Sequence, residues 1–216
     1  MAGRSDESRR EAGTLVLVHG AGSGPWIFES WRSCFEGWRL ELVDLQAGLG
    51  VAEASMADYA AVIERATEGV PRPLVLAGWS LGGLAVLMAV EATRPDLVGV
   101  LEPSPPAEIQ GPDPGVPLVP GTFDPQVAYG PFPESVPARP ESTVARAERK
   151  RGISVSTLSC PSVVVYGKEF PADRGRTVAA LYGSEALAFP DLDHWALVLD
   201  RRVPEALAST VARLSG

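Results

Sequence analysis

The feature that most constrains this chain is the repeated succession of a short apolar run and a longer segment of helical spacing. Six apolar runs predict strands, at residues 14–19, 39–44, 73–79, 97–102, 162–166 and 186–189. Four segments have helical spacing, at residues 56–67, 81–93, 177–182 and 204–214. Because the runs are continuously apolar, we expect strands that are buried on both faces. The succession predicts an α/β fold, with helices on both faces of a mostly parallel sheet of about six strands.

Length and charge narrow the class of protein further. The chain has 216 residues, of which 45% are hydrophobic, which suits one sizeable core. We predict a single domain over residues 13–216, preceded by a disordered tail at residues 1–12. The net charge of -8 disfavours nucleic acids and anionic membranes as partners. We therefore expect a small-molecule substrate and a monomer or homodimer. With no signal-peptide core and no apolar run of membrane-spanning length, the sequence predicts a cytoplasmic protein.

The cysteine pattern bears on metals and disulfides. The two cysteines, Cys34 and Cys160, are far apart in the chain and belong to no metal-ligand spacing. Reduced thiols are therefore expected rather than a disulfide or a zinc site. We expect no metal and no cofactor.

A proline-rich stretch interrupts the succession of strands and helices. Residues 103–140 contain 12 of the chain's 20 prolines, which excludes a regular helix or strand over most of that length. Residues 141–151 regain helix-favouring side chains and are followed by Gly152, a typical helix C-terminal residue. Residues 103–152 are predicted to form a short Pro-rich cap.

The strongest local motif is Gly78-Trp79-Ser80-Leu81-Gly82, between an apolar run and a segment of helical spacing. The pattern G-x-S-x-G is weak by itself, but this context is the strand-turn-helix that presents a nucleophilic serine. Glycines are needed because side chains at the flanking positions would collide with the neighbouring strand and helix. The alternative, a glycine-rich helix entry capped by Ser80, is disfavoured by the context. Ser80 is the candidate nucleophile.

A serine nucleophile needs a base within hydrogen-bond reach, and histidine suits that task. The chain has two histidines, His19 after the first strand and His194 after the last. The chain order of serine before histidine selects His194 as the base. The neighbouring Asp191 and Asp193 are interpreted as turn formers and caps.

The chain resembles the α/β-hydrolase family in three motifs: the His19-Gly20 turn, the Ser80 motif and the Asp193-His194 turn. The resemblance runs from about residue 14 to the end. It includes a faint likeness to the plant methylesterase and hydroxynitrile lyase branch. The resemblance implies a three-layer α/β-hydrolase fold. It also implies an oxyanion hole formed by the backbone N–H groups of Ala21 and Leu81. His19 is expected to brace its turn, and Asp44 to have a structural role.

The acid that orients the histidine departs from the family pattern. The family usually carries an aspartate three residues beyond the glycine that ends the penultimate strand, and that position is Phe170. Glu169 lies one residue earlier and is our first choice, since the chemistry needs only a carboxylate at the other imidazole nitrogen. Asp173 is the second choice, with a helix cap as its alternative role. Glu102, after the fourth strand, is the third, because some relatives place the acid there.

Aromatic side chains near the motifs and in the cap suggest a partly apolar pocket, although any one of them could instead cover the core. The candidates are Trp26, Trp79, Phe123, Tyr129, Phe132 and Trp195. The basic residues Arg146, Arg149, Lys150 and Arg151 favour a solvated helix face near a helix C-terminus. Recognition of an anionic group on a substrate is the alternative.

These residues predict a serine hydrolase that cleaves an ester, thioester or lactone-type carbonyl of a small, partly apolar substrate through an acyl-enzyme on Ser80. Because a fold does not fix a function, two alternatives remain open. One is other chemistry on the same residues, such as carbon-carbon bond cleavage or cofactor-free perhydrolysis. The other is a binding module without turnover.

Overall fold

The structure, a computed structural model, describes residues 11–168 and 172–214. Its main sheet has six parallel strands in the order β2-β1-β3-β4-β7-β8. The strands are β1 (Thr14–Val18), β2 (Arg39–Val43), β3 (Leu74–Trp79), β4 (Leu97–Leu101), β7 (Ser162–Gly167) and β8 (Glu185–Phe189). The predicted six-stranded parallel sheet is confirmed, with strand bounds within one residue of those expected.

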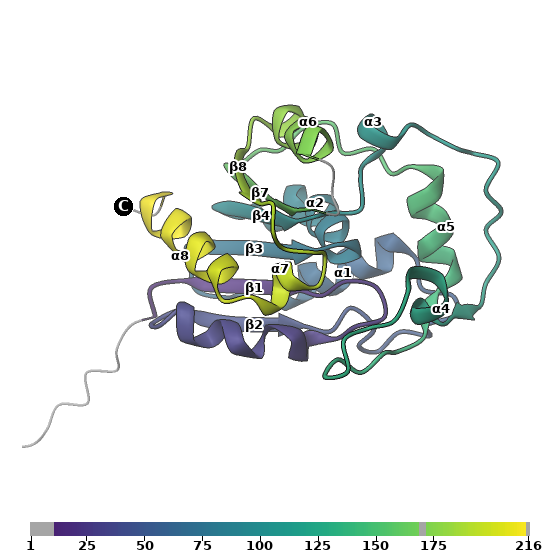
Figure 1. The fold of residues 1–216 in the computed structure, drawn as a ribbon, viewed down its shortest axis with the longest axis horizontal. Coiled ribbons are helices and arrows are strands. Elements are labelled where there is room, and N and C mark those ends of the chain that lie inside the picture. Colours follow the sequence, from purple (N-terminus) through teal and green to yellow (C-terminus); the bar gives the residue numbers. More distant parts are fainter. Residues whose placement is uncertain (1–10, 169–171, 215–216) are drawn as a thin grey trace, which may run out of the picture.

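Helices cover both faces of the sheet, as predicted (Figure 1). One face packs on α1 (Met56–Ala66), α2 (Leu81–Thr93) and α6 (Ala172–Tyr182). The other packs on η1 (Pro25–Cys34), α7 (Ala196–Leu199) and α8 (Arg202–Leu214). The sequence analysis missed η1, a 3-10 helix, and α7, and it placed the start of α6 at residue 177. A 3-10 helix has three residues per turn, so η1 does not follow the 3.6-residue spacing.

Burial explains why the strands could be predicted from the sequence. Every residue of β1, β3, β4 and β7 is buried, whereas the edge strands β2 and β8 are partly exposed. A strand that is covered on both faces needs apolar side chains on both, which removes the alternation. The two apolar clusters on either side of the sheet form the core.

The cap leaves the sheet after β4 and returns at β7. It contains α3 (Ala107–Gln110), β5 (Thr122–Phe123), α4 (Pro125–Tyr129), β6 (Glu141–Ser142) and α5 (Thr143–Arg151). The helix expected over residues 141–151 therefore starts at Thr143, because Ser142 caps it by accepting a hydrogen bond from the Ala145 N–H. Figure 1 shows α4 and α5 together at one end of the sheet, beyond the ends of its strands.

The tail expected at residues 1–12 lies outside the described residues up to residue 10, while the Ala12 N–H donates to the Gly37 carbonyl. Cys34 and Cys160 are free thiols. In the part of the chain that the structure describes, no helix has the length and apolar character to span a membrane.

Candidate active site

The carboxyl ends of the strands bring the motif residues together. Ser80 follows β3, Glu102 follows β4 and His194 follows β8, and parallel strands all end at the same edge of the sheet. The strand order reverses at β1, since β2 lies on one side of it and β3 on the other. Ligand sites of open α/β sheets form at such a reversal, beyond the carboxyl ends. The sheet topology therefore favours a site beside Ser80.

Ser80 occupies a strained turn between β3 and α2. Its φ of 56° and ψ of -119° lie in a region that residues other than glycine rarely adopt. Flanking glycines make the turn possible: a Cβ on Gly78 would collide with the Gly82 carbonyl, and one on Gly82 with the His19 carbonyl. The physical reason given for the G-x-S-x-G pattern is therefore visible in the packing. Such strain costs about 1–3 kcal/mol and is typical of functional sites.

His194 is paired with a buried carboxylate. Its Nδ1 lies 2.6 Å from Oε2 of Glu102, whose side chain is 2% exposed. The other carboxylate oxygen of Glu102 accepts a hydrogen bond of 2.7 Å from the Gly167 N–H. Both oxygens of a carboxylate that water does not reach are thus hydrogen-bonded. The pairing engages Nδ1 of the His194 ring and leaves the other ring nitrogen, Nε2, outside the contact with Glu102.

Trp79, inside the serine motif, positions the histidine loop. Its indole Nε1 donates a hydrogen bond of 3.1 Å to the His194 carbonyl. Its ring also packs on the rings of His194 and Trp195, with centroid separations of 4.7 Å in both pairs. The nucleophile turn and the histidine loop are therefore held together by one buried side chain.

The described residues place one of the three candidate acids beside His194. Glu169, the first choice, lies outside the described residues, and the side chain of Asp173 is not described either. The carboxylate in contact with His194 is Glu102, the third choice. The ends of β4 and β7 are neighbours in the sheet, so an acid after either strand can reach the same imidazole nitrogen. Gly167, which ends β7, now binds Glu102 through its N–H.

The amides of Ala21 and Leu81 are both free to bind a ligand. Within the described residues, neither donates a hydrogen bond to another protein atom. Leu81 is the first residue of α2, where a backbone N–H has no partner within the helix. His19 braces the Ala21 turn, as expected: Nδ1 contacts the Gly20 carbonyl at 2.8 Å, and Nε2 accepts from the Leu45 N–H.

A cleft of about 480 Å³ opens over the motif residues. It is lined by Ala21, Trp79, Ser80, Tyr129, Gly130, Pro131, Phe132, Arg149, Asp193, His194 and Trp195. The volume is in the range of small-molecule sites. A larger groove of about 600 Å³ lies along α2 and residues 153–159, but no described residue that lines it is a histidine. The cleft with Ser80 and His194 is therefore the candidate active site.

The structure separates the six aromatic pocket candidates. Trp79, Tyr129, Phe132 and Trp195 line the cleft. Trp26 and Phe123 are not part of its lining. The Trp26 ring lies under the Arg139 guanidinium at 5.0 Å, and Phe123 packs edge-on against Tyr129 with a centroid separation of 5.8 Å.

Sequence reasoning missed the contacts that attach the cap to the Ala21 turn. Arg139 forms two hydrogen bonds with Asp44, of 2.8 and 2.9 Å, and its Nε donates to the Ser23 carbonyl. The pKa of Asp44 is held well below its usual range by the contact with His19 and by Arg139. These partners are about 95 residues apart in the chain, and no local pattern connects them. The structural role expected for Asp44 is to attach the cap.

A second attachment is buried. Glu141, 1% exposed, accepts hydrogen bonds from the Gly22 N–H at 3.1 Å, from the Ser142 N–H and from the Tyr59 hydroxyl. Burial, and then the Glu141 charge, raise the pKa of Tyr59 above its ordinary value. Tyr59 therefore remains a hydrogen-bond donor. Gly22 directly follows Ala21, so the cap is connected to the candidate oxyanion hole.

The described residues contain no cluster of three His, Cys, Asp or Glu side chains that could hold a metal ion. The arrangement that they do contain is a strained serine, a histidine paired with a buried carboxylate, and two free amides. Such a set can perform nucleophilic chemistry at a carbonyl.

Comparisons with known proteins bear on the family and the fold. A stretch of 83 residues is 29% identical to the pimeloyl-[acyl-carrier protein] methyl ester esterase of Shewanella sp. (strain MR-7) and covers 38% of this chain and 31% of that esterase. The fold is similar to that of polyneuridine aldehyde esterase, with a TM-score of 0.66 and 17% identity over 93% of this chain and 99% of that one. A lipase-esterase related protein from Clostridium acetobutylicum ATCC 824 has a TM-score of 0.67 at 16% identity, over 95% and 96% of the two chains.

The match that decides the family covers almost the whole chain. Residues 15–215 match the family model described as "Alpha/beta hydrolase family". This range includes the serine turn, the histidine loop and the cap. The chain therefore belongs to the alpha/beta hydrolase family.

Proposed function

We propose that this protein is a serine hydrolase that cleaves an ester, thioester or lactone-type carbonyl through an acyl-enzyme on Ser80. The observation that carries the proposal is the pairing of His194 with the buried Glu102, because His194 lines the same cleft as a serine in a strained turn. The esterase names of the similar proteins support ester cleavage.

The proposed acylation step uses the three side chains in order. His194 Nε2 removes the Ser80 proton, and the Ser80 oxygen attacks the substrate carbonyl carbon. The carbonyl oxygen becomes an oxyanion, which accepts hydrogen bonds from the Ala21 and Leu81 amides. The tetrahedral intermediate then expels the alcohol or thiol, to which His194 returns the proton. Loss of one oxyanion donor typically costs about 3 kcal/mol of barrier.

Deacylation repeats the same steps with water. His194 removes a proton from water, the hydroxide attacks the acyl carbon, and the Ser80 oxygen leaves with the proton from His194. Glu102 holds the ring in one orientation and stabilises the imidazolium in both halves of the reaction. In this proposal Glu102 replaces Glu169 as the acid of the triad.

Intact-mass spectrometry after exposure to a fluorophosphonate probe tests the nucleophile. We expect one covalent adduct on the wild type, none on Ser80→Ala, and hydrolysis of p-nitrophenyl esters by the wild type alone. An adduct on another residue, or equal hydrolysis by Ser80→Ala, would refute the proposal. Ester turnover without an acyl-enzyme would indicate that water attacks the substrate carbonyl directly, without a covalent intermediate on Ser80.

A further inference from the structure

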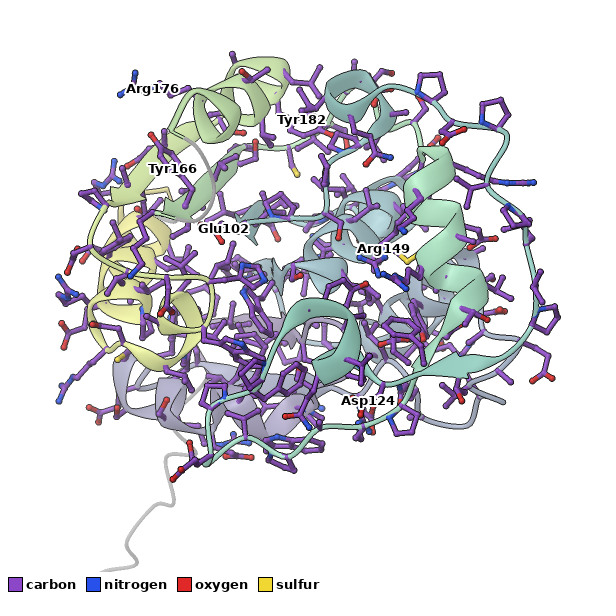
Figure 2. All side chains as sticks on the ribbon, turned by 45° about the vertical axis from the view of Figure 1, so that its right-hand side comes forward. Glu102, Asp124, Arg149, Tyr166, Arg176 and Tyr182 are labelled. Atoms are coloured by element: carbon purple, nitrogen blue, oxygen red, sulfur yellow. The ribbon has the colours of Figure 1, made fainter. Side chains whose placement is uncertain are left out.

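One cation on the cap faces the nucleophile. Arg149 lies in the last turn of α5 and lines the same cleft as Ser80 and His194. Figure 2 shows the Arg149 side chain on the inner side of α5, directed toward the sheet rather than toward solvent. Lys150, the next residue, is exposed. Of the basic run at the end of α5, Arg149 is the member that the fold places in the cleft.

Among the described residues, no acidic side chain pairs with the charge of Arg149. Its Nη1 donates to the Ser104 hydroxyl at 3.0 Å and its Nη2 to the Tyr129 hydroxyl at 3.2 Å, and both acceptors are neutral. Its Nε is buried and has no hydrogen-bond partner. No carboxylate among the described residues lies within ion-pair distance of Arg149, although arginine rarely lies in a pocket without one. A chain with a net charge of -8 has many carboxylates that could have filled this role.

The hydrogen bonds to Ser104 and Tyr129 orient the Arg149 guanidinium but do not neutralise its charge. Ser104 lies three residues beyond the end of β4, and its N–H donates to the Ser80 carbonyl at 2.8 Å. The hydroxyl that holds Arg149 is therefore attached to the nucleophile turn itself. The ring of Tyr129 also contacts Arg146, whose guanidinium lies 5.4 Å from the ring centroid. The cation thus has a defined position relative to Ser80.

We propose that Arg149 is a specificity-determining residue that binds a carboxylate on the substrate, at a short distance from the carbonyl that Ser80 attacks. This inference rests on the proposed function for the reacting carbonyl. Arginine binds carboxylates through two parallel charge-assisted hydrogen bonds, which add geometric specificity as well as energy. The substrate class is the monoester or monothioester of a dicarboxylic acid, with one carboxyl group free.

A carboxylate fits better than a phosphate. Arg149 is the only Lys or Arg that lines the described part of the cleft, and it can neutralise one negative charge. A phosphate monoester carries a charge of about -1.5 to -2 at neutral pH, which would leave an excess. Asp193 also lines the cleft, with its Oδ1 hydrogen-bonded to the Ala196 N–H, and it would repel that excess.

Paired substrates measure the preference. The p-nitrophenyl monoester of adipic acid has a free carboxylate, and p-nitrophenyl hexanoate has the same length of acyl chain without it. We expect the wild type to prefer the adipate monoester in kcat/KM. The ratio of the two kcat/KM values should fall roughly ten- to hundredfold in Arg149→Gln, the range for loss of a hydrogen-bonded charged partner. Arg149→Lys should recover part of the ratio, and the exposed control Lys150→Gln should keep the wild-type ratio.

A binding measurement separates the two proposals. In Ser80→Ala, the adipate monoester should change the tryptophan fluorescence, because Trp79 and Trp195 line the cleft. The additional Arg149→Gln change should weaken that binding. Wild-type turnover of hexanoate at or above that of the monoester, or monoester binding that Arg149→Gln leaves unchanged, overturns the inference and leaves the serine hydrolase intact. Arg149-dependent binding without turnover or probe labelling supports the carboxylate site and refutes the hydrolase.

Discussion

The cleft has a floor, at the carboxyl ends of β3, β4 and β8, and a roof, residues 103–152. Buried and strained backbone positions the side chains of the floor, whereas half-exposed side-chain contacts position those of the roof. On the floor, Ser80 and Glu102 both have positive φ, and Glu102 is buried. On the roof, the cleft-facing Tyr129 is half exposed and Arg149 depends on two hydroxyl groups. This difference fits the proposal that the floor carries the reaction and the roof selects the substrate.

The two regions are joined at a few places. Arg139 and Glu141 of the roof bind Asp44 and Gly22, which follow the neighbouring strands β2 and β1, and Gly22 is next to the Ala21 amide. Loops that carry specificity tolerate change better than the scaffold that positions a reacting group. Substitutions on the floor should therefore affect every substrate, and those on the roof should mainly change the preference among substrates.

Gly82→Ala should give the largest loss among the structural variants. The added Cβ would collide with the backbone carbonyls of His19 and Val18, so the serine turn must shift. Overpacking typically costs about 1–3 kcal/mol, and a shift of about 1 Å can cost about 100-fold in turnover. Thermal unfolding and ester hydrolysis measure the two effects.

Gly115→Ala is the matched control on the roof. Its Cβ would meet only the side chain of Asp113, at 3.3 Å, and we expect a change in stability below about 0.5 kcal/mol. Equal damage from both variants would show that the floor is no more constrained than the roof.

Glu141→Gln tests whether the roof is anchored to the oxyanion turn. The new amide group would face donors that now bind a carboxylate, which leaves a buried donor unpaired at a cost of about 1–3 kcal/mol. We expect a lower Tm and a several-fold lower kcat, because Gly22 precedes Ser23 and follows Ala21 in the same turn. The exposed Glu134→Gln is the control. A lower Tm with unchanged kcat would limit Glu141 to stability.

Asp44→Asn should have the smallest effect of the variants that remove a contact, and one that depends on pH. The pKa of Asp44 is lowered in the folded protein, so its contribution to stability is present above the unfolded-state pKa and is lost as the pH falls. We expect the variant to be about 1 kcal/mol less stable near neutral pH, and the difference to shrink below about pH 4. Urea unfolding at several pH values measures this, and a constant difference would contradict the assignment.

The sheet was predictable because its evidence is local. The strands β1, β3, β4 and β7 are buried along their whole length, so each appears in the sequence as a continuous apolar run. The nucleophile turn was predictable because its motif lies within five consecutive residues, although Gly82 is required by a contact with the distant His19 turn.

The acid and the roof depend on contacts between distant residues. Glu102 and Glu169 follow neighbouring strands of the sheet, and sequence alone does not show which carboxylate reaches His194. The helical spacing of Arg146 and Arg149 places them on one face of α5. Which face meets the cleft is decided by Arg139 and Glu141, whose partners Asp44 and Tyr59 are more than 80 residues away.

The most direct test of the triad is kcat/KM for a p-nitrophenyl ester in Glu102→Gln and Glu169→Gln, measured beside the wild type. Glu102→Gln keeps the shape of the side chain but removes the charge that stabilises the His194 imidazolium. We expect kcat/KM to fall roughly 1,000- to 10,000-fold in Glu102→Gln and to stay close to the wild-type value in Glu169→Gln. A larger loss in Glu169→Gln than in Glu102→Gln would contradict this expectation.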